Sequence, residues 1–232
     1  RTWEPTWHAM GVTLKSASEI AKMRVAGRLA AQVLEMIQEH VQPGITTDEL
    51  DRICHDFIVN EQNAIPAPLD YRGFPKSLCS SLNEVICHGI PDSTALQDGD
   101  ICNIDITAYY AGVHGDTNAT FFVGDVAPES RQLVSVTEEC MWHGIEAVKP
   151  GRSLSEIGRA IEVHAKKYKY GVVRAFVGHG IGKEMHEPPQ VPNYGRPGRG
   201  QLMKPGLVIA IEPMITAGSW HVKIDDDGWT AR

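Results

Sequence analysis

The chain has 232 residues, is 42% hydrophobic and carries a net charge of −7, which suits one large or two small globular domains with an ordinary core. The acidic charge and the lack of a long basic run argue against nucleic acid or a membrane as the main partner, and no apolar run approaches the roughly 18 residues of a membrane span. Without such a run or a leader that resembles a signal peptide, the sequence predicts a cytoplasmic protein. Its five cysteines lack CxxC spacing, which indicates neither a disulfide framework nor a zinc ribbon.

The first part of the chain predicts an extended arm followed by two helices. Residues 1–15 are rich in Trp and Pro without clear periodicity, and we expect them to lie over the body of the protein. Ser16 and Glu19 form a capping box ahead of apolar residues at helical spacing. A second capping box, Thr46 with Glu49, predicts another amphipathic helix.

The rest of the chain predicts two further helices among short strands. One helix follows Pro128, and the other starts at a capping box formed by Ser153 and Glu156. Strands are expected at residues 77–81, 85–88, 172–180, 207–215 and 221–224, and a Pro/Gly-rich loop at residues 188–200.

Residues 103–122 predict a β-hairpin that carries two carboxylates. Successive residues alternate between two faces, and Ala111-Gly112 supplies the reversal. With the turn centred just before Ala111, Asp105 and Asp116 face each other, and like charges in this position are destabilising. Neither strand has a Lys or Arg near them, so one divalent metal ion, or two that share the carboxylates, would be an economical counter-charge. A solvated acidic hairpin or a single calcium site is an equal alternative.

An internal repeat divides the chain into two related halves. The sequence VQPG at residues 41–44 recurs as VKPG at residues 148–151, an offset of 107 residues. The same offset carries Asp105 onto Glu212. We therefore expect a duplicated helix-and-strand unit with approximate two-fold symmetry, in which a third acid, Glu212, joins the hairpin pair.

Three histidines stand in suggestive positions. His179 lies in VGHGIG, where flanking glycines allow close backbone approach, and a metal ligand is favoured over a structural role because three acids would need a nitrogen donor for a transition-metal site. His88, which stands at the end of an apolar run, and His186 are candidates for a general acid or a hydrogen-bond donor to substrate. For these two, a structural role remains a strong alternative.

Four segments resemble the signature segments of type I methionine aminopeptidases, and the resemblance spans nearly the whole chain after Ser16. They are GFPKSLCSSLNEVICHGIP, DGDICNIDITAYYAGVHGDTNATF, GHGIGKEMHEPPQVPNY and KPGLVIAIEPMI. The resemblance implies the α+β pita-bread (creatinase/aminopeptidase) fold, with two halves related by a pseudo-two-fold axis, antiparallel sheet and outer helices. Residues 16–232 would form a single catalytic domain, preceded by the extension of residues 1–15.

The resemblance also implies a dinuclear site built on Co, Mn, Fe or Zn. Asp105 would bind one ion, Asp116 would bridge both, and His179 and Glu212 would bind the other. A metal-bound hydroxide would attack the carbonyl after an N-terminal methionine, while His88 and His186 match the family histidines that contact the scissile amide and the tetrahedral intermediate. Five residues would line a pocket for the methionine side chain: Tyr71, Phe74, Cys79, Met185 and Trp229.

The chain departs from the family pattern at three points. A fifth ligand, a bridging Glu, is expected about a dozen residues after Thr230, so we expect the working protein to extend beyond Arg232. Met185 stands where bacterial relatives commonly carry Phe, and Phe74 stands where Tyr is common. Both positions remain apolar.

The resemblance points to nascent polypeptides with an N-terminal methionine as substrates. It also makes the ribosome a candidate partner and favours a monomer that neither reads nucleic acid nor binds membrane. Two alternatives stay open. One is another pita-bread peptidase, such as a Xaa-Pro aminopeptidase or dipeptidase, and the other is an inactive binding protein on the same scaffold.

Overall fold

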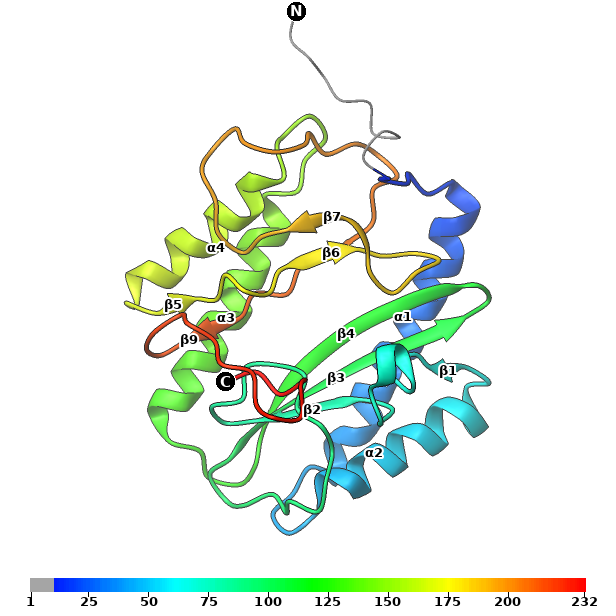
Figure 1. The fold of residues 1–232 in the computed structure, drawn as a ribbon, viewed down its shortest axis with the longest axis vertical. Helices are drawn as coiled ribbons and strands as arrows, with labels where there is room; N and C mark the ends of the chain where they lie inside the picture. The colour runs from blue at the N-terminus through cyan, green and yellow to red at the C-terminus, as the bar shows by residue number, and fades with distance from the viewer. Residues whose placement is uncertain (1–10) are drawn as a thin grey trace, which may run out of the picture. The chain divides into compact units, whose positions relative to one another are not determined.

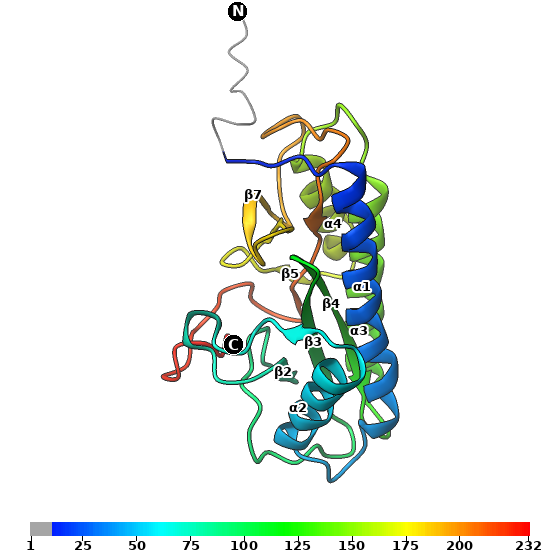
Figure 2. The ribbon, with the colours of Figure 1, turned by 90° about the vertical axis from the view of Figure 1, so that its right-hand side faces the viewer.

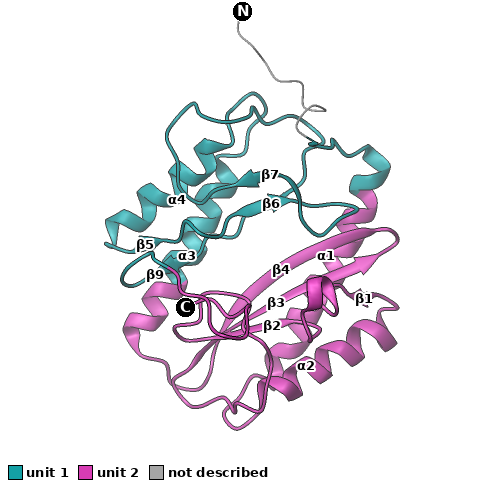
Figure 3. Ribbon diagram, in the orientation of Figure 1, with its two compact units in different colours: residues 1–20, 135–221 teal, residues 21–134, 222–232 magenta. Residues whose placement is uncertain are grey.

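The computed structural model describes residues 11–232, which form two compact units (Figure 1 and Figure 3). Within this range, unit 1 contains residues 11–20 and 135–221, and unit 2 contains residues 21–134 and 222–232. The prediction of an extended arm falls mostly on residues 1–10, which lie outside the described residues. Among the described residues, no helix has the length and apolar character needed to cross a membrane.

Unit 2 is built on an antiparallel sheet with β3 (Ile101–Tyr110) at its centre. The strand pairs with β1 (Ile65–Pro66), β2 (Cys79–Leu82) and β4 (Val113–Phe122). Figures 1 and 2 show α1 (Ala17–Ile37) alongside β3 and β4, and the buried residues of α1 and β3 share one apolar core. Because Ile104 and Ile106 of β3 enter this core, Asp105 between them lies on the opposite face of the strand.

The first two helices of the chain start where the sequence predicts. Ser16 N donates to Glu19 Oε2 at 2.8 Å and Glu19 N donates to Ser16 Oγ at 3.2 Å, which completes the predicted capping box. A short 3₁₀ turn, η2 (Gln38–His40), follows α1. At α2 (Thr47–Asp56), Thr46 accepts from Glu49 N, but Glu49 pairs with Arg52 instead of returning to Thr46. A π-helical turn, η3 (Phe57–Glu61), extends α2.

Unit 1 packs two helices over short strands. Its core joins α3 (Pro128–Glu146), which begins in unit 2, and α4 (Ser155–Lys167) to β5 (Gly171–Val172) and β7 (Glu187–Val191). The sheets are β5–β9, with β9 at Ile215–Thr216, and β7–β6–β8, with β6 at Gly178–Gly180 and β8 at Ile209–Ala210. The capping box predicted at Ser153 is wrong, because the Ser153 hydroxyl bonds to Ser155 and not to a helix N–H.

Several predicted strands are wrong in extent or position. Residues 172–180 and 207–215 each contain two short strands separated by irregular chain, and residues 85–88 and 221–224 form isolated bridges only. Conversely, all of β7 except Glu187 falls in the stretch predicted as loop, because an edge strand tolerates the prolines that suggested a loop. A 3₁₀ turn, η4 (Tyr71–Gly73), precedes β2.

The predicted duplication is confirmed by matching contacts within the two units. The bridge between Thr46 and Ala95 in unit 2 recurs between Ser153 and Leu202 in unit 1. The bond from Gly44 N to Leu96 O at 2.8 Å likewise recurs from Gly151 N to Met203 O at 2.9 Å. All four pairs of positions keep the 107-residue offset read from the sequence. The backbone segments that precede α2 and α4 therefore form equivalent bridges and hydrogen bonds.

Candidate metal centre and substrate pocket

The two hairpin carboxylates of unit 2 share a face but are not directly opposed. The turn places Ala111 at φ 51° and Gly112 at φ 84°, so the hairpin is centred between them. Asp105 therefore pairs with Asn118 and Asp116 with Thr107, so the turn is centred one residue later than predicted and the predicted direct opposition of the two acids is wrong. Because Asp105 and Thr107 are two residues apart on β3, Asp116 still lies on the Asp105 face, as a diagonal neighbour.

The hairpin holds both carboxylates in a semi-buried setting. Asp105 and Asp116 are each half-buried. Thr107 Oγ1 donates to Asp116 Oδ1 at 3.3 Å and so orients it. Cys79 of β2 pairs with Asp105 on the other side, and burial, followed by the Asp105 charge, raises the pKa of its thiol well above the ordinary value. These features suit a cation on this face of the sheet.

Unit 1 brings His179 and Glu212 into direct contact. His179 lies on β6 opposite Ala210 of β8, and Glu212 follows that strand by two residues. His179 Nε2 lies 3.1 Å from Glu212 Oε1. The imidazole is buried, and its Nδ1 lies 2.8 Å from the carbonyl oxygen of Gly180.

The Gly180 carbonyl fixes which ring nitrogen of His179 carries the proton. A carbonyl can only accept, so Nδ1 must donate to it, and a neutral ring then has its lone pair on Nε2. That lone pair faces the Glu212 carboxylate, an arrangement that needs either a proton or a metal ion between the two acceptors. Histidine ligands in metal sites are oriented by such a bond from the other ring nitrogen to a backbone carbonyl. The pair therefore fits a divalent metal ion.

Asn193 is a functional candidate that the sequence analysis missed. It is fully buried, and its Nδ2 donates to the backbone carbonyl of Glu212 at 3.0 Å. Its amide therefore fixes the segment that carries the Glu212 side chain. Nothing in local spacing predicts this contact, because the two residues follow β7 and β8, which are brought into one sheet by pairing with β6.

His88 occupies a strained and closely packed position in unit 2. The residue has φ 57°, which ends any strand there. The next residue must be glycine, because a Cβ on Gly89 would lie 2.0 Å from the backbone oxygen of Ser80. Gly89 N also donates to Ser81 Oγ at 3.2 Å, which anchors the segment to β2. Burial lowers the pKa of His88 below its ordinary value, which favours the neutral ring.

Two of the residues predicted to line a methionine pocket, Phe74 and Trp229, are in contact within unit 2. Trp229 meets the ring of Phe74 edge-on with centroids 5.2 Å apart, and its ring centroid lies 6.3 Å from that of His88. Asp227 holds the Trp229 loop by accepting from the Trp229 and Thr230 amides at 2.8 Å each. Phe74 is buried and therefore supplies an apolar wall, as expected for a pocket that takes a thioether side chain.

Met185 and His186 lie in unit 1, on the loop between β6 and β7. Met185 is buried, whereas His186 is exposed and its ring centroid lies 4.2 Å from that of His179. The structure thus brings His186 to the His179–Glu212 pair.

Within the described residues of each unit, no three His, Cys, Asp or Glu side chains gather into a group that could hold a metal ion.

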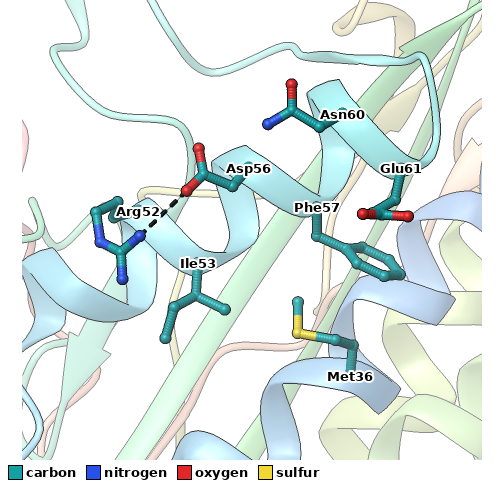
Figure 4. A pocket seen from close by; sticks show the side chains of 7 residues that line it. All are labelled: Met36, Arg52, Ile53, Asp56, Phe57, Asn60 and Glu61. Atoms are coloured by element: carbon teal, nitrogen blue, oxygen red, sulfur yellow. Dashed lines mark hydrogen bonds and ion pairs between the residues drawn. The ribbon is translucent and has the colours of Figure 1, made fainter.

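A surface pocket of about 300 Å³ lies elsewhere on unit 2, between α1, α2 and η3 (Figure 4). Met36, Ile53 and Phe57 line its apolar part, and Arg52 forms an ion pair with Asp56 at 3.2 Å along its edge. It contains none of the predicted site residues, so the chemistry described above does not involve it.

Comparison with known proteins gives one consistent result. The model of metallopeptidase family M24 matches residues 21–230. Methionine aminopeptidase 2 of Mycobacterium tuberculosis is 57% identical over 211 residues, which cover 91% of this chain and 74% of that protein. The crystal structure of methionine aminopeptidase from Rickettsia prowazekii superposes with a TM-score of 0.93 at 48% identity and covers 95% of this chain and 89% of that chain.

The prolidase of Pyrococcus horikoshii is a weaker structural neighbour. It has a TM-score of 0.72 at 24% identity and covers 86% of this chain but only 55% of that chain, so it shows a shared fold alone. The pita-bread fold implied by the sequence is therefore confirmed. Because the family model spans most of the chain and relatives match it at high identity, the chain belongs to metallopeptidase family M24 and, within it, to the methionine aminopeptidases.

Proposed function

We propose that this protein removes the N-terminal methionine from polypeptides by hydrolysis, with Asp105, Asp116, His179 and Glu212 binding two divalent metal ions. The observation that carries the proposal is the His179–Glu212 pair, in which a lone-pair nitrogen faces a carboxylate oxygen at 3.1 Å. Asp105 and Asp116 add two further carboxylates on one face of the hairpin. Three carboxylates and one imidazole are a donor set that suits Mn, Fe, Co or Zn better than Ca.

The metal would supply one part of the chemistry and the protein the other. When bound, a divalent ion lowers the pKa of a coordinated water and polarises a carbonyl. His88, whose neutral ring is favoured by burial, can donate a hydrogen bond to the scissile amide or accept a proton there. His186, exposed beside His179, would donate a hydrogen bond to the oxygen on which charge develops.

The substrate pocket would select methionine by apolar contact. Phe74 and Trp229 provide a buried ring and an edge-on partner, and Tyr71, Cys79 and Met185 complete the proposed lining. The uncharged Cys79 thiol, with its raised pKa, adds a polarisable sulfur surface. A flexible thioether packs well against such a surface, whereas a charged side chain would lose its hydration there.

The setting of the reaction follows from the substrate class. We infer a cytoplasmic monomer that meets nascent chains at the ribosome. The cysteines in the described part of the chain are all free, which fits a reducing compartment.

Peptide specificity tests the proposal. The metal-loaded protein should release methionine from Met-Ala-Ser and leave Ala-Pro-Ser intact, and removal of the metal by a chelator should stop turnover. Cleavage of Ala-Pro-Ser in preference to Met-Ala-Ser would instead favour a Xaa-Pro peptidase. Tight binding of Met-Ala-Ser without turnover would favour the inactive binding protein.

A further inference from the structure

A buried lysine links the segment before α1 to the strand that follows His186. Lys15 Nζ lies 2.6 Å from Glu187 Oε2, and the two side chains are only 6% and 11% exposed. Lys15 N also donates to the carbonyl of Gly206 at 2.7 Å. Removing two charges from water is costly, so such an ion pair persists only where its geometry is good and further hydrogen bonds satisfy it.

Glu187 has those further hydrogen bonds. Its Oε2 also accepts from Thr13 Oγ1 at 3.0 Å, and its Oε1 accepts from the Glu184 amide at 3.1 Å. Burial alone would raise the pKa of Glu187, but the bonds from Lys15 and the Glu184 amide lower it below the ordinary value. One carboxylate therefore joins the segment before α1 to the loop of residues 181–186.

The same loop is also held directly by the Lys15 side chain. A Cβ on Gly182 would lie 2.5 Å from Lys15 Cε, so the lysine stem lies against the loop backbone. Gly182 N donates to Glu184 O at 3.1 Å, which closes a turn within the loop. Lys15 thus contacts the start of the loop through Gly182 and the residue just after the loop, Glu187.

This loop carries two residues of the proposed site. Met185 is buried, and the ring of His186, the residue before Glu187, lies 4.2 Å from the ring of His179. We propose that Lys15, through its buried ion pair with Glu187, is a positioning residue that holds His186 and Met185 in place for the reaction. This inference rests on the proposed function, because it assigns a role to Lys15 in that same site.

The test compares three variants. Lys15→Met removes the charge and keeps an apolar stem, and Glu187→Gln keeps the shape but weakens the pair. Lys183→Met is the matched control, because Lys183 lies on the same loop and pairs with Glu19 at 3.8 Å, but its side chain is 77% exposed. Each variant is measured for kcat and KM on Met-Ala-Ser, for Mn²⁺ affinity, and for the NMR signals of the His186 ring in the metal-free protein.

We expect Lys15→Met and Glu187→Gln to lower kcat by about 10- to 100-fold, the range that a misplaced group of about 1 Å can cost. Mn²⁺ affinity should stay within about twofold, since neither residue is a proposed ligand. The His186 ring signals should shift in both variants, and the double variant should lose less than the product of the single losses. Lys183→Met should match the wild type in every measurement.

The two proposals fail separately. No turnover by the wild-type protein would overturn the proposed function, and the His186 ring signals would still decide the role of Lys15. Unmoved signals in Lys15→Met, or kcat equal to that of Lys183→Met, would overturn the positioning role. If Lys15→Met does not fold, Thr13→Val removes a single donor to Glu187 and should shift the same signals by a smaller amount.

Discussion

At the scale of single residues, the different ligand roles expected for Asp105 and Asp116 predict different effects of their loss. If Asp116 bridges two ions, its loss removes a ligand from both, whereas the loss of Asp105 removes a ligand from one. We therefore expect Asp116→Ala to abolish Mn²⁺ or Co²⁺ binding more completely than Asp105→Ala. Isothermal titration measures the number of ions bound. Undiminished two-site binding by the Asp116 variant would contradict a dinuclear site.

His88 and His186 are proposed to act on substrate and not on metal. His88→Asn and His186→Asn should each keep their metal content and lose about 10²- to 10⁴-fold in turnover, as is typical for a positioned acid or hydrogen-bond donor. Asparagine suits position 88 because it tolerates the positive φ found there. Metal analysis of each purified variant provides the control, and loss of metal would show that the residue is a ligand.

The buried His88 ring also predicts a pH dependence of stability. Its pKa is lowered in the folded protein, so the unfolded chain binds the proton first as the pH falls below about 6.5. The free energy of unfolding should therefore decrease between pH 7.5 and pH 5.5 in the metal-free protein. Denaturant titrations should show a smaller decrease in His88→Asn. Equal decreases in both proteins would mean that His88 keeps an ordinary pKa.

At the scale of elements, replacing either of two glycines of unit 2 by alanine should change the stability of the protein in opposite directions. Gly89→Ala would place a Cβ 2.0 Å from Ser80 O and should destabilise the protein by about 1 to 3 kcal/mol. Gly27, inside α1, has open space around it, so Gly27→Ala should stabilise by about 0.5 to 1 kcal/mol. Urea denaturation measures both changes. A neutral Gly89→Ala would show that the segment bearing His88 is not held against β2.

Some of these elements could be predicted from the sequence, and others could not. The capping residues Ser16 and Thr46 act through contacts three residues away, so local spacing reveals them. The exact centre of the hairpin depends on which two residues adopt positive φ, and a shift of one residue there changes the β4 partner of Asp105 from Asp116 to Asn118. The strand β7 escaped prediction because its place at a sheet edge, and not its own sequence, allows its prolines.

At the scale of the whole molecule, the duplication can be predicted from the sequence because the two halves keep the same turn glycines as well as similar side chains. Gly99 and Gly206, at matched positions, have φ 97° and 91°, a region that favours glycine. The same offset pointed to Glu212 as the counterpart of Asp105. By contrast, Asn193 and Lys15 could not be predicted, because their partners lie far away in the sequence and only tertiary packing reveals them.

If ligands from both units bind the same ions, their substitutions should not act independently. Mn²⁺ should raise the melting temperature of the wild-type protein, because a ligand that binds only the folded state stabilises it. Asp116→Asn and Glu212→Gln should each reduce this rise, and the double variant should lose less than the sum of the two effects. Strict additivity would indicate two separate metal sites.

The most direct test of the account is turnover of Met-Ala-Ser by protein stripped of metal and then titrated with Mn²⁺ or Co²⁺. The account predicts that stripped protein releases no methionine, that activity returns as metal binds, and that Asp116→Asn and Glu212→Gln stay inactive at metal concentrations that restore the wild type. Methionine release by the stripped protein, or full recovery of both variants, would contradict it.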